Sequence, residues 1–596
     1  MENRLRRKET KYATAGILLT GCFLYFRFFT PYSLCFKEQI QLFVFSSPSL
    51  WEYFTKPAVL ACLAGDYLTQ FLYFKTGGAL VVTLLLALEW RLVWLTLKRF
   101  YSIKPTLFSG EALFALSFLP VIVEWITLPH LHFSLSLSVS LIIALCTFII
   151  YTELSGKIAF FACILLIPFL YVSAGASVFL FLALAVLYNR QQKFQCMTLL
   201  AFTIVLPFIL RHAYLLTLKQ TFLYPFPDLL HGLGLAAAAF IVLLFVAFSG
   251  IRGVIIVIAW TIVLVTGLIQ STDRNQERLY GMIIEASHNQ WDKILDIAGK
   301  TELKKPIAAC YTNLALSQKN LLGERLMDFY QPFSSGLLLI NKPDAGWLDI
   351  FSSCDTYYHI GDMEMAQHAA LTGMLFSPNQ RSARLVERLA EINLTTGDIP
   401  AATKYIRMLQ STLFHKIKPD MLSKDRPQQV YFREDTIRRA VDVKASLTLL
   451  AKSNPENLPA INYLLCFYLL NKDIPSFFEV YTTYYKGAVA HASNSALASN
   501  PVANPASIPA SNPAPVPAPV PAPAPVPKVY AEALLIYFAA SKSPVEKLLE
   551  YGIHPDMIQQ FSEYTRIYEA SNGSLVAVQP AFSNTYWVFY HFAITK

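Results

Sequence analysis

The stretch GVIIVIAWTIVLVTGLIQSTDRNQERLY (253–280) marks the point at which the character of the chain changes. It begins as an uncharged apolar run and becomes charged after Ser271. Residues 12–270 hold only eight of the forty acidic residues in this 596-residue chain, whereas the residues after them hold thirty. Because runs of ~20 apolar residues are typical of transmembrane helices, we predict a transmembrane domain over 1–270 and a soluble region beyond it.

Nine apolar runs predict an all-α fold whose first part is a bundle of about nine transmembrane helices. The runs cover residues 12–30, 77–97, 111–129, 133–152, 156–173, 175–189, 195–211, 229–248 and 251–270. The basic N-terminus resembles the start of a signal peptide, but no cleavage site follows the first run, which favours an uncleaved anchor. Residues 31–76 mix aromatic and polar side chains and predict a first outer loop with interfacial or re-entrant helices.

The basic residues predict how the chain is oriented. More lysines and arginines fall on the side of the N-terminus than on the other side, and this excess marks the cytoplasmic face. With nine spans, the region after Ser271 lies outside the cytoplasm. In a Gram-negative cell this places the chain in the inner membrane with its C-terminal region in the periplasm. One span more or fewer would reverse the placement.

A short motif recurs in the soluble region, which we place at 271–493. Gly361-Asp362 returns as Gly397-Asp398 thirty-six residues later, and GDIPAA (397–402) is echoed by KDIPSF (472–477). Each copy lies between two amphipathic helical patterns, and stacked helix pairs of this kind bury one continuous core. The spacing resembles that of tetratricopeptide repeats and predicts a degenerate helical solenoid. A generic helical bundle is the alternative.

The end of the chain divides into a spacer and a helical segment. Residues 494–528 are rich in proline and alanine, a composition that favours polyproline II rather than a packed core. This linker either spans toward the cell wall or a partner, or is an expanded insertion within one helical domain. Residues 529–596 resume the amphipathic pattern and predict a helical continuation of the soluble domain. Their aromatic C-terminus suits either a short strand pair or a docking helix.

Several classes of protein are not indicated by the sequence. The net charge of +9 is spread over short loops, so nucleic acid is not a predicted partner. The nine cysteines show no metal-ligand spacing, although one bridge among Cys310, Cys354 and Cys466 stays open. Phosphate-loop, zinc-protease and serine-hydrolase motifs are absent from the sequence. No cofactor is predicted from these patterns.

Ionisable residues gather at the predicted outer face. Glu38 and Asp66 are the candidate catalytic carboxylates. A further group, here called the polar mouth, comprises His130, His132, Arg211, His212, Asp228 and His231. Charged groups at membrane depth are costly and usually line a cavity or path. Each of these residues taken alone is also compatible with a solvated loop position.

Two other ionisable residues lie on the predicted cytoplasmic half of the second span. Glu89 and Arg91 are two positions apart and so cannot pair along one helix face. Each needs a partner from another helix, or extends toward the cytoplasmic interface.

The order of these parts resembles the GT-C class of lipid-linked sugar transferases. In that class an acidic residue of the first outer loop acts as base or metal ligand. The resemblance implies this role for Glu38, with Asp66 second, a lipid-linked sugar as substrate, and a divalent metal as the one cofactor. The paired acidic residues of the class are missing here, because position 39 is glutamine.

At the level of its segments, the chain more closely resembles an uncharacterised family of multi-pass membrane proteins from Bacteroidetes. The stretches EQIQLFVF (38–45), YLTQFLYFKTGGALVV (67–82) and NLALSQKNLLGERLMDFYQ (313–331) carry this resemblance. It implies the two-part architecture and an inner-membrane location, and no activity.

Two functions follow as expectations. The first is a non-enzymatic membrane protein, embedded in lipid, whose periplasmic repeats bind an envelope protein or organise an assembly. The second is an enzyme that acts on a lipid-linked sugar at the outer face of the membrane. The internal symmetry expected of a transporter is not evident in the spans.

Overall fold

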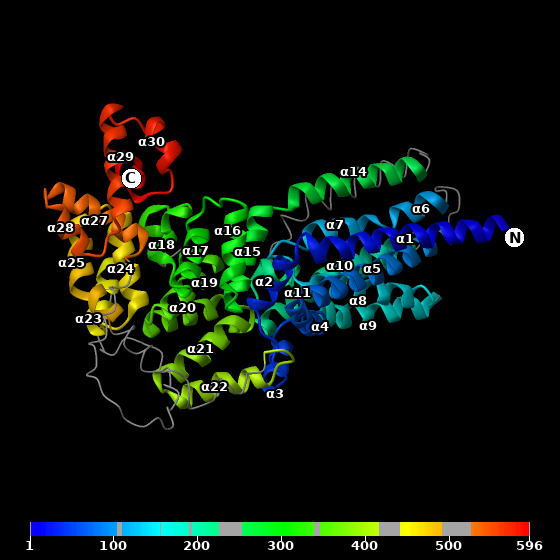
Figure 1. Ribbon diagram of the computed structural model, residues 1–596. Helices are drawn as coiled ribbons and strands as arrows, with labels where there is room; N and C mark the ends of the chain where they lie inside the picture. Colours follow the sequence, from blue (N-terminus) through cyan, green and yellow to red (C-terminus); the bar gives the residue numbers. More distant parts are fainter. Residues whose placement is uncertain are drawn as a thin grey trace, which may run out of the picture. The chain divides into compact units, whose positions relative to one another are not determined.

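The computed structural model describes residues 2–103, 110–154, 156–189, 193–225, 253–338, 346–415, 442–490 and 526–594. These residues form helices and no strand, which confirms the all-α prediction for the described part of the chain (Figure 1). The chain forms two compact units. Unit 1 comprises Met1–Tyr280, Ser377–Glu387 and Lys404–Ile417, and unit 2 comprises Gly281–Phe376, Arg388–Thr403 and Lys418–Lys596.

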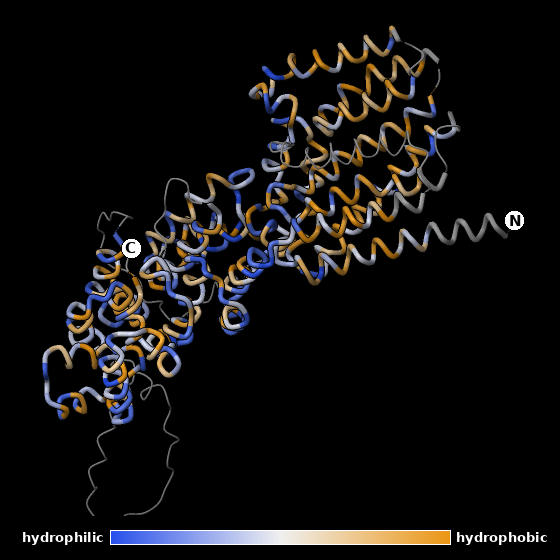
Figure 2. Tube along the Cα trace, turned by 90° about the horizontal axis from the view of Figure 1, so that it is seen from above, coloured by the Kyte–Doolittle hydropathy of each residue, from blue (hydrophilic) through white to orange (hydrophobic). Residues whose placement is uncertain are grey.

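Unit 1 contains the helices of the N-terminal part of the chain. They are α1 (Glu2–Phe28), α2 (Pro31–Gln39), α3 (Ser47–Glu52), α4 (Val59–Thr69), α5 (Lys75–Ile103), α6 (Gly110–Leu116), α7 (Leu119–Thr127), α8 (Leu135–Tyr151), α9 (Gly156–Ala174), α10 (Val178–Tyr188), α11 (Lys193–Tyr214), α12 (Leu218–Leu223) and α14 (Gly253–Ser271). Figure 2 shows that most of their length is hydrophobic. The helix α15 (Arg274–Ser287) begins where this apolar sequence ends.

The number of predicted spans is too high. Among the described residues, three helical stretches are long and apolar enough to cross a membrane, namely Lys75–Ser102, Ile158–Tyr188 and Phe194–Tyr214. A fourth is the pair Tyr12–Phe28 and Pro31–Gln39, if the two helices, which meet at 66°, form one broken span. Only 22% to 39% of each of the three stretches is buried, so most of their apolar surface faces outward. Apolar surface of this extent is typical of contact with lipid or another protein.

The excess in the prediction arises from apolar runs that do not form long helices. Leu113–Thr127 and Leu135–Tyr151 are apolar helical stretches of at most 17 residues, and Ile258–Ser271 is the part of α14 whose side chains are described. The run 229–248 lies outside the described residues. Apolar composition indicates that a segment is buried or faces lipid, but it does not fix where the helix ends, so counting runs overestimates the number of spans.

One predicted break does appear between α9 and α10. Gly175 joins them with a φ of +64°, a conformation that glycine adopts readily. The hydroxyl of Ser140 in α8 donates to the Ala174 carbonyl at the end of α9 and also contacts Ser177 before α10. Asn189, after α10, donates to Tyr151 at the far end of α8. The helix is therefore interrupted at Gly175, within the stretch Ile158–Tyr188 and between the predicted runs 156–173 and 175–189.

Unit 2 is built from pairs of shorter helices. They are α16 (Trp291–Lys300), α17 (Pro306–Gln318), α18 (Leu322–Arg325), α19 (Trp347–His359), α20 (Met363–Phe376), α23 (Val443–Ser453), α24 (Leu458–Leu470), α25 (Ile474–Val480), α27 (Lys528–Ala540), α28 (Val545–Glu550), α29 (Pro555–Ala570), α30 (Leu575–Phe582) and α31 (Tyr586–Phe592). Three helices contribute residues to both units, namely α15, α21 (Ala383–Thr396) and α22 (Ile399–Gln410).

The recurring motif of the sequence forms the same turn three times. Gly361, Gly397 and Lys472 have φ values of 89°, 84° and 60°. The aspartate after each one accepts a hydrogen bond from a backbone N–H three residues later, at Met365, Ala401 and Ser476. Each turn therefore ends one helix in a left-handed residue and caps the next with a carboxylate. The helix pairs of the prediction are present, and their stacking as a tetratricopeptide-like solenoid stays a prediction.

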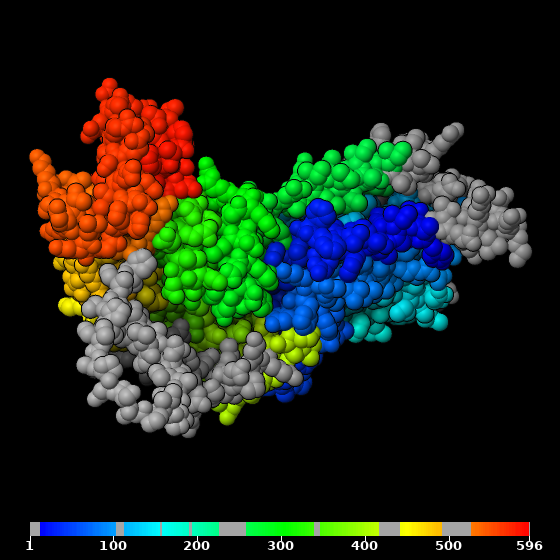
Figure 3. Space-filling view, in the orientation of Figure 1, coloured from blue at the N-terminus to red at the C-terminus, as the bar shows by residue number. Residues whose placement is uncertain are grey.

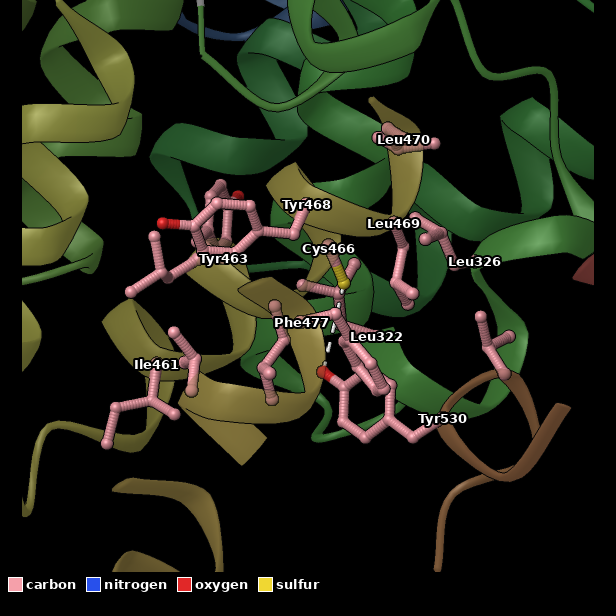
Figure 4. Packing of buried hydrophobic residues seen from close by; sticks show 14 of the residues in the cluster. Leu322, Leu326, Ile461, Tyr463, Cys466, Tyr468, Leu469, Leu470, Phe477 and Tyr530 are labelled. Atoms are coloured by element: carbon pink, nitrogen blue, oxygen red, sulfur yellow. Dashed lines mark hydrogen bonds between the residues drawn. The ribbon is translucent and has the colours of Figure 1, made fainter. Parts of the chain in front are cut away.

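Aromatic side chains fill the core of unit 2. Tyr463, Tyr530 and Trp587 are fully buried. Figure 4 shows Tyr530 among residues of α18, α24 and α25, with its hydroxyl 3.8 Å from the sulfur of Cys466. The aromatic C-terminus forms the helices α30 and α31, so of its two predicted forms the structure shows the helical one. Most of the linker 494–528 lies outside the described residues.

All nine cysteines lie among the described residues and are free thiols. The bridge that the sequence left open for the soluble part is not formed. Cys354 donates to the Ala366 carbonyl at 3.5 Å and Cys310 to the Ser335 carbonyl at 3.3 Å. Each of these buried thiols therefore has a backbone partner in place of a second cysteine.

Candidate functional site

The helix α2 carries the candidate residue Glu38 and is capped from outside at its first turn. The carboxylate of Glu277 in α15 accepts hydrogen bonds from the backbone N–H groups of Tyr32 at 2.6 Å and Ser33 at 3.0 Å. The first N–H groups of a helix have no acceptor within the helix. Burial raises the pKa of Glu277 to about 7, although these hydrogen bonds act in the opposite direction. Glu277 thereby fixes where α2 begins.

The C-terminal end of α2 contacts two segments from much later in the chain. The hydroxyl of Ser382 donates to the Gln39 carbonyl at 2.6 Å, and the Arg384 guanidinium donates to the Gln39 side-chain oxygen at 3.0 Å. His415 lies 2.5 Å from a carboxylate oxygen of Glu38. Figure 3 shows the residues that lead to His415 in yellow-green against the blue surface of the first residues of unit 1. Backbone pairing of Phe45 with the Ser411 carbonyl at 2.7 Å fixes the same contact.

The Glu38–His415 pair is an ion pair in a largely dry environment. The side chains are 5% and 9% exposed. Burial by itself lowers the pKa of His415, but the adjacent Glu38 carboxylate more than offsets this and raises that pKa to about 9. His415 is therefore positively charged at neutral pH, and Glu38 is its counter-ion.

A cavity of about 940 Å³ lies in unit 1 beside this pair. Its wall includes groups from α2, α4, the loop before α8 and the region of α12. The polar and ionisable side chains that line it include Lys37, Tyr53, Asp66, His132, Lys219 and Tyr224. The cavity thus joins two carboxylates, Glu52 and Asp66, with several basic side chains.

Asp66 is the more buried of the two carboxylates in the cavity wall, since Glu52 is exposed and pairs with Arg381. Asp66 lies on α4, and the Tyr53 hydroxyl donates to it at 2.8 Å. Burial raises the pKa of Asp66 to about 6, and the hydrogen bond from Tyr53 limits the rise. Its neighbour Gly65 places α4 directly against α8, because a Cβ atom at position 65 would lie 2.4 Å from the backbone of Ser136. The position of Asp66 is therefore set by a close helix–helix contact.

The predicted residues separate into three groups. Asp66 and His132 line the cavity, whereas Glu38 does not and pairs with His415 instead. Arg211 donates to the Leu216 carbonyl at 3.0 Å, so it closes the end of α11, and His212 is exposed on the same turn. Asp228 and His231 lie outside the described residues.

His130 lies near the cavity without lining it. Partial burial and the positive charges of Lys37 and His132 lower the pKa of His130. The structure therefore gathers Asp66, His132 and Lys37 from the predicted outer loops, and leaves Arg211 and His212 elsewhere.

Three contributors to this region were missed by the sequence analysis. His415 is 377 residues from Glu38, and no local pattern links them. Tyr53 precedes its partner Asp66 by 13 residues in a loop with several aromatic residues, so nothing singled it out. Gln39 looked like the loss of a paired acid, but its amide oxygen accepts a hydrogen bond from Arg384.

Comparison with known families identifies the family of the chain. A family of unknown function, DUF6057, matches residues 8–499 and 519–593. The chain belongs to this family. The DUF6057 match includes α2, the cavity residues and His415, and it omits only 500–518 between its two parts. That gap falls within the predicted proline-rich linker.

No curated protein and no solved structure matches the chain. The DUF6057 match confirms an uncharacterised family and brings no activity. The function is therefore inferred from the chemistry of the cavity.

Proposed function

We propose that this protein is a bacterial inner-membrane transferase that resembles the GT-C class and takes a sugar from a lipid-linked donor. The observation that carries the proposal is the position of Asp66 in the wall of the cavity, together with Lys37 and Lys219. A base with a pKa of about 6 is mostly ionised at neutral pH and still accepts a proton readily. Lysine ammonium groups are suited to binding phosphate oxygens.

The proposed reaction is a single displacement. The Asp66 carboxylate accepts the proton of an acceptor hydroxyl while the hydroxyl oxygen bonds to the anomeric carbon of the donor sugar. The bond from that carbon to the phosphate oxygen breaks, and the lipid phosphate leaves with the electron pair. Lys219 offsets the negative charge on the leaving phosphate, which lowers the barrier electrostatically. Lys37 is held at the cavity wall by hydrogen bonds from its side-chain nitrogen to the Leu128 and Phe133 carbonyls, and burial lowers the pKa of Lys37 to about 7.

Glu38 is not the candidate base, although its place in the first outer loop implied that role. Its carboxylate is paired with His415 and does not line the cavity. Glu38 therefore supports α2, which carries Lys37 into the cavity wall, and Asp66 is the candidate base.

A divalent metal does not fit the donor groups of this site. The described residues contain no group of three His, Cys, Asp or Glu side chains placed to bind a metal ion. Of the two carboxylates in the cavity wall, Asp66 accepts a hydrogen bond from Tyr53 and Glu52 pairs with Arg381. No step of the proposed reaction involves a metal.

The test compares lipid extracts from cells that carry the wild-type chain, Asp66→Asn or Asp296→Asn. Asp296 is exposed on α16 and serves as the matched control. We expect polyprenyl-phosphate-linked sugar to accumulate with Asp66→Asn alone, as measured by mass spectrometry. Identical extracts from all three strains, with equal protein levels, would exclude Asp66 as the base of such a reaction.

The orientation is tested separately by labelling with a membrane-impermeant maleimide. Asp556→Cys is on α29 of unit 2, and Lys98→Cys is near the predicted cytoplasmic end of α5; both positions are exposed. We expect spheroplasts to label the first and not the second. Labelling of Lys98→Cys alone would place unit 2 in the cytoplasm.

The repeated turns of unit 2 favour a second function beside the first. Helix pairs joined by equivalent turns are a common scaffold for binding other proteins. We propose that unit 2 binds an envelope protein. Crosslinking in intact cells, followed by purification of the full chain, is expected to recover a specific partner at positions in α19 and α20. Recovery of the same proteins with crosslinkers placed in α5 would show that no such partner exists.

A further inference from the structure

A tight turn forms part of the cavity wall at its opening. Residues 378–381 lie between α20 and α21 and belong to unit 1. The Arg381 N–H donates to the Pro378 carbonyl at 3.1 Å, which closes a β-turn. The two central residues, Asn379 and Gln380, are both left-handed, with φ values of 52° and 53°. Both residues are exposed and line the cavity, so this turn lies at the cavity opening.

Glutamine is an unusual residue for the second central position of such a turn. Turns with two left-handed central residues favour Asn-Gly, because asparagine tolerates this conformation and glycine adopts it without strain. A glutamine side chain makes the same conformation unfavourable. Strain of this kind is concentrated at binding and active sites. The fold alone would be served by glycine at position 380, so the glutamine side chain points to a ligand.

Contacts after the turn hold it in this conformation. The Arg381 guanidinium pairs with Glu52 at the end of α3, at 3.1 Å. The Ser382 hydroxyl donates to the Gln39 carbonyl at the end of α2, at 2.6 Å. These contacts fix the turn against two other segments of unit 1. The side chains of the turn are therefore positioned before any ligand arrives, which favours binding.

The side-chain groups of the turn fit a ligand rich in hydroxyl groups. Each amide offers two N–H donors and one carbonyl acceptor, and a hydroxyl group also donates and accepts. Within the described residues, the side chains of Asn379 and Gln380 make no hydrogen bond. Further amide and hydroxyl side chains line the same cavity, namely Gln41, Gln220, Ser134 and Thr217. A molecule with several hydroxyls can therefore pair with this wall at several points.

The charges beside the turn favour a neutral ligand. Arg381 follows the two amides, and its positive charge is offset by Glu52. Amide side chains carry no charge of their own. An acidic or basic ligand would therefore find no unpaired counter-charge at the turn. The lysines of the cavity belong to other segments, such as Lys219 of α12.

We propose that Asn379 and Gln380 bind the hydroxyl groups of a neutral oligosaccharide and hold it in the cavity as the acceptor. This inference rests on the proposed transferase function and extends it by naming the class of acceptor. An oligosaccharide held at the opening can direct one hydroxyl to Asp66, which lines the same cavity. The two amides determine which acceptor is used and take no part in the bond changes.

The test measures binding of the full chain in detergent to an array of neutral, acidic and amine-bearing oligosaccharides. The variant Asn379→Gly/Gln380→Gly removes both amides and keeps the turn, because glycine suits two left-handed positions. We expect the wild-type chain to bind neutral oligosaccharides. The double variant should lose about tenfold in affinity, as expected for two lost hydrogen bonds. Its thermal midpoint should not fall, whereas a purely structural role of the side chains would lower it.

Two further variants separate the side-chain amides from the backbone of the turn. Lys542→Gly is the matched control, because Lys542 is exposed and left-handed, with a φ of 50°, and lies in unit 2. It should leave oligosaccharide binding unchanged. Gln380→Asn keeps an amide on a residue that tolerates the left-handed conformation, so it should retain most of the binding.

The proposal would be overturned if the wild-type chain bound no neutral oligosaccharide, or if the double glycine variant bound as the wild type does. Lipid extracts from the Asp66→Asn strain separate this result from the test of the transferase. Accumulated lipid-linked sugar without oligosaccharide binding would remove the acceptor assignment and leave the transferase in place. Oligosaccharide binding that depends on the two amides, without such accumulation, would leave a glycan-binding site and remove the transferase.

Discussion

The Nε2 atom of His415 lies 2.5 Å from a carboxylate oxygen of Glu38, although 377 residues separate the two in the chain. Because both side chains are buried, removal of one leaves the other as an unpaired charge. We expect His415→Gln to lower the stability of unit 1 by about 3 kcal/mol. Thermal unfolding in detergent should show a lower midpoint. His368→Gln, at an exposed position of α20, is the control and should leave the midpoint unchanged.

The same pair predicts a dependence of stability on pH. The pKa of His415 is raised in the folded state from 6.5 to about 9, so the folded state holds this proton more tightly than the unfolded state. The stabilisation is therefore complete below pH 6.5 and is lost as the pH rises through about 9. We expect the thermal midpoint of the wild-type chain to fall across this window. The His415→Gln variant should show a smaller fall, and equal falls would contradict the ion pair.

The hydrogen bond from Tyr53 to Asp66 makes a prediction about the cavity. That hydrogen bond lowers the pKa of Asp66, so Tyr53→Phe should raise the pKa above about 6. If Asp66 is the base, the acidic limb of a pH–activity profile moves to higher pH in Tyr53→Phe, while activity at alkaline pH is retained. A profile that keeps its midpoint would show that Asp66 does not control the reaction.

Gly65 predicts how tightly α4 and α8 are packed. A methyl group at this position would lie 2.4 Å from backbone atoms of Ser136, and backbone does not move aside easily. We expect Gly65→Ala to separate the two helices, to displace Asp66 and to lower the thermal midpoint. Gly16→Ala is the matched control, because no atom lies within 4 Å of an added methyl group there. Its higher helix propensity should leave stability equal or slightly improved.

The turn at Gly397 predicts that an alanine there lowers stability through the backbone conformation alone. No atom lies within 4 Å of an added Cβ, but the φ of +84° is unfavourable for alanine. Gly397→Ala should therefore destabilise unit 2 by about 1–2 kcal/mol. Gly299→Ala in α16 has the same open space and an ordinary helical φ, so it should be neutral or stabilising. Chemical denaturation of the two variants distinguishes these outcomes.

The sequence predicted those features that depend on local patterns. Helical periodicity identified the helix pairs of unit 2, and Gly361 and Gly397 marked two of their turns. Lys472 was identified only because the motif around it repeats, since its side chain gives no signal for a left-handed residue. The predicted runs 156–173 and 175–189 also meet next to the break at Gly175.

Features that depend on distant contacts were not predictable from one sequence. The number of spans was too high, because an apolar run does not encode the length of its helix. Asp66 and His132 were found as candidates, but the choice between Asp66 and Glu38 required knowledge of His415. Glu89 was expected to find a partner on another helix or to extend toward the cytoplasm, and the structure buries it in the interior of unit 1.

The composition of unit 1 has a consequence for the order in which the protein is made. The partners of Gln39 and Glu38 at Arg384 and His415 leave the ribosome only after Gly281–Phe376 of unit 2 has been translated. Until then the Glu38 carboxylate and the Gln39 amide at the end of α2 lack their partners His415 and Arg384. A nascent chain therefore inserts its apolar helices long before this end of α2 has all its partners. A fragment that stops at Phe376 would keep every predicted span but would lack Arg384 and His415, which hold α2 in place.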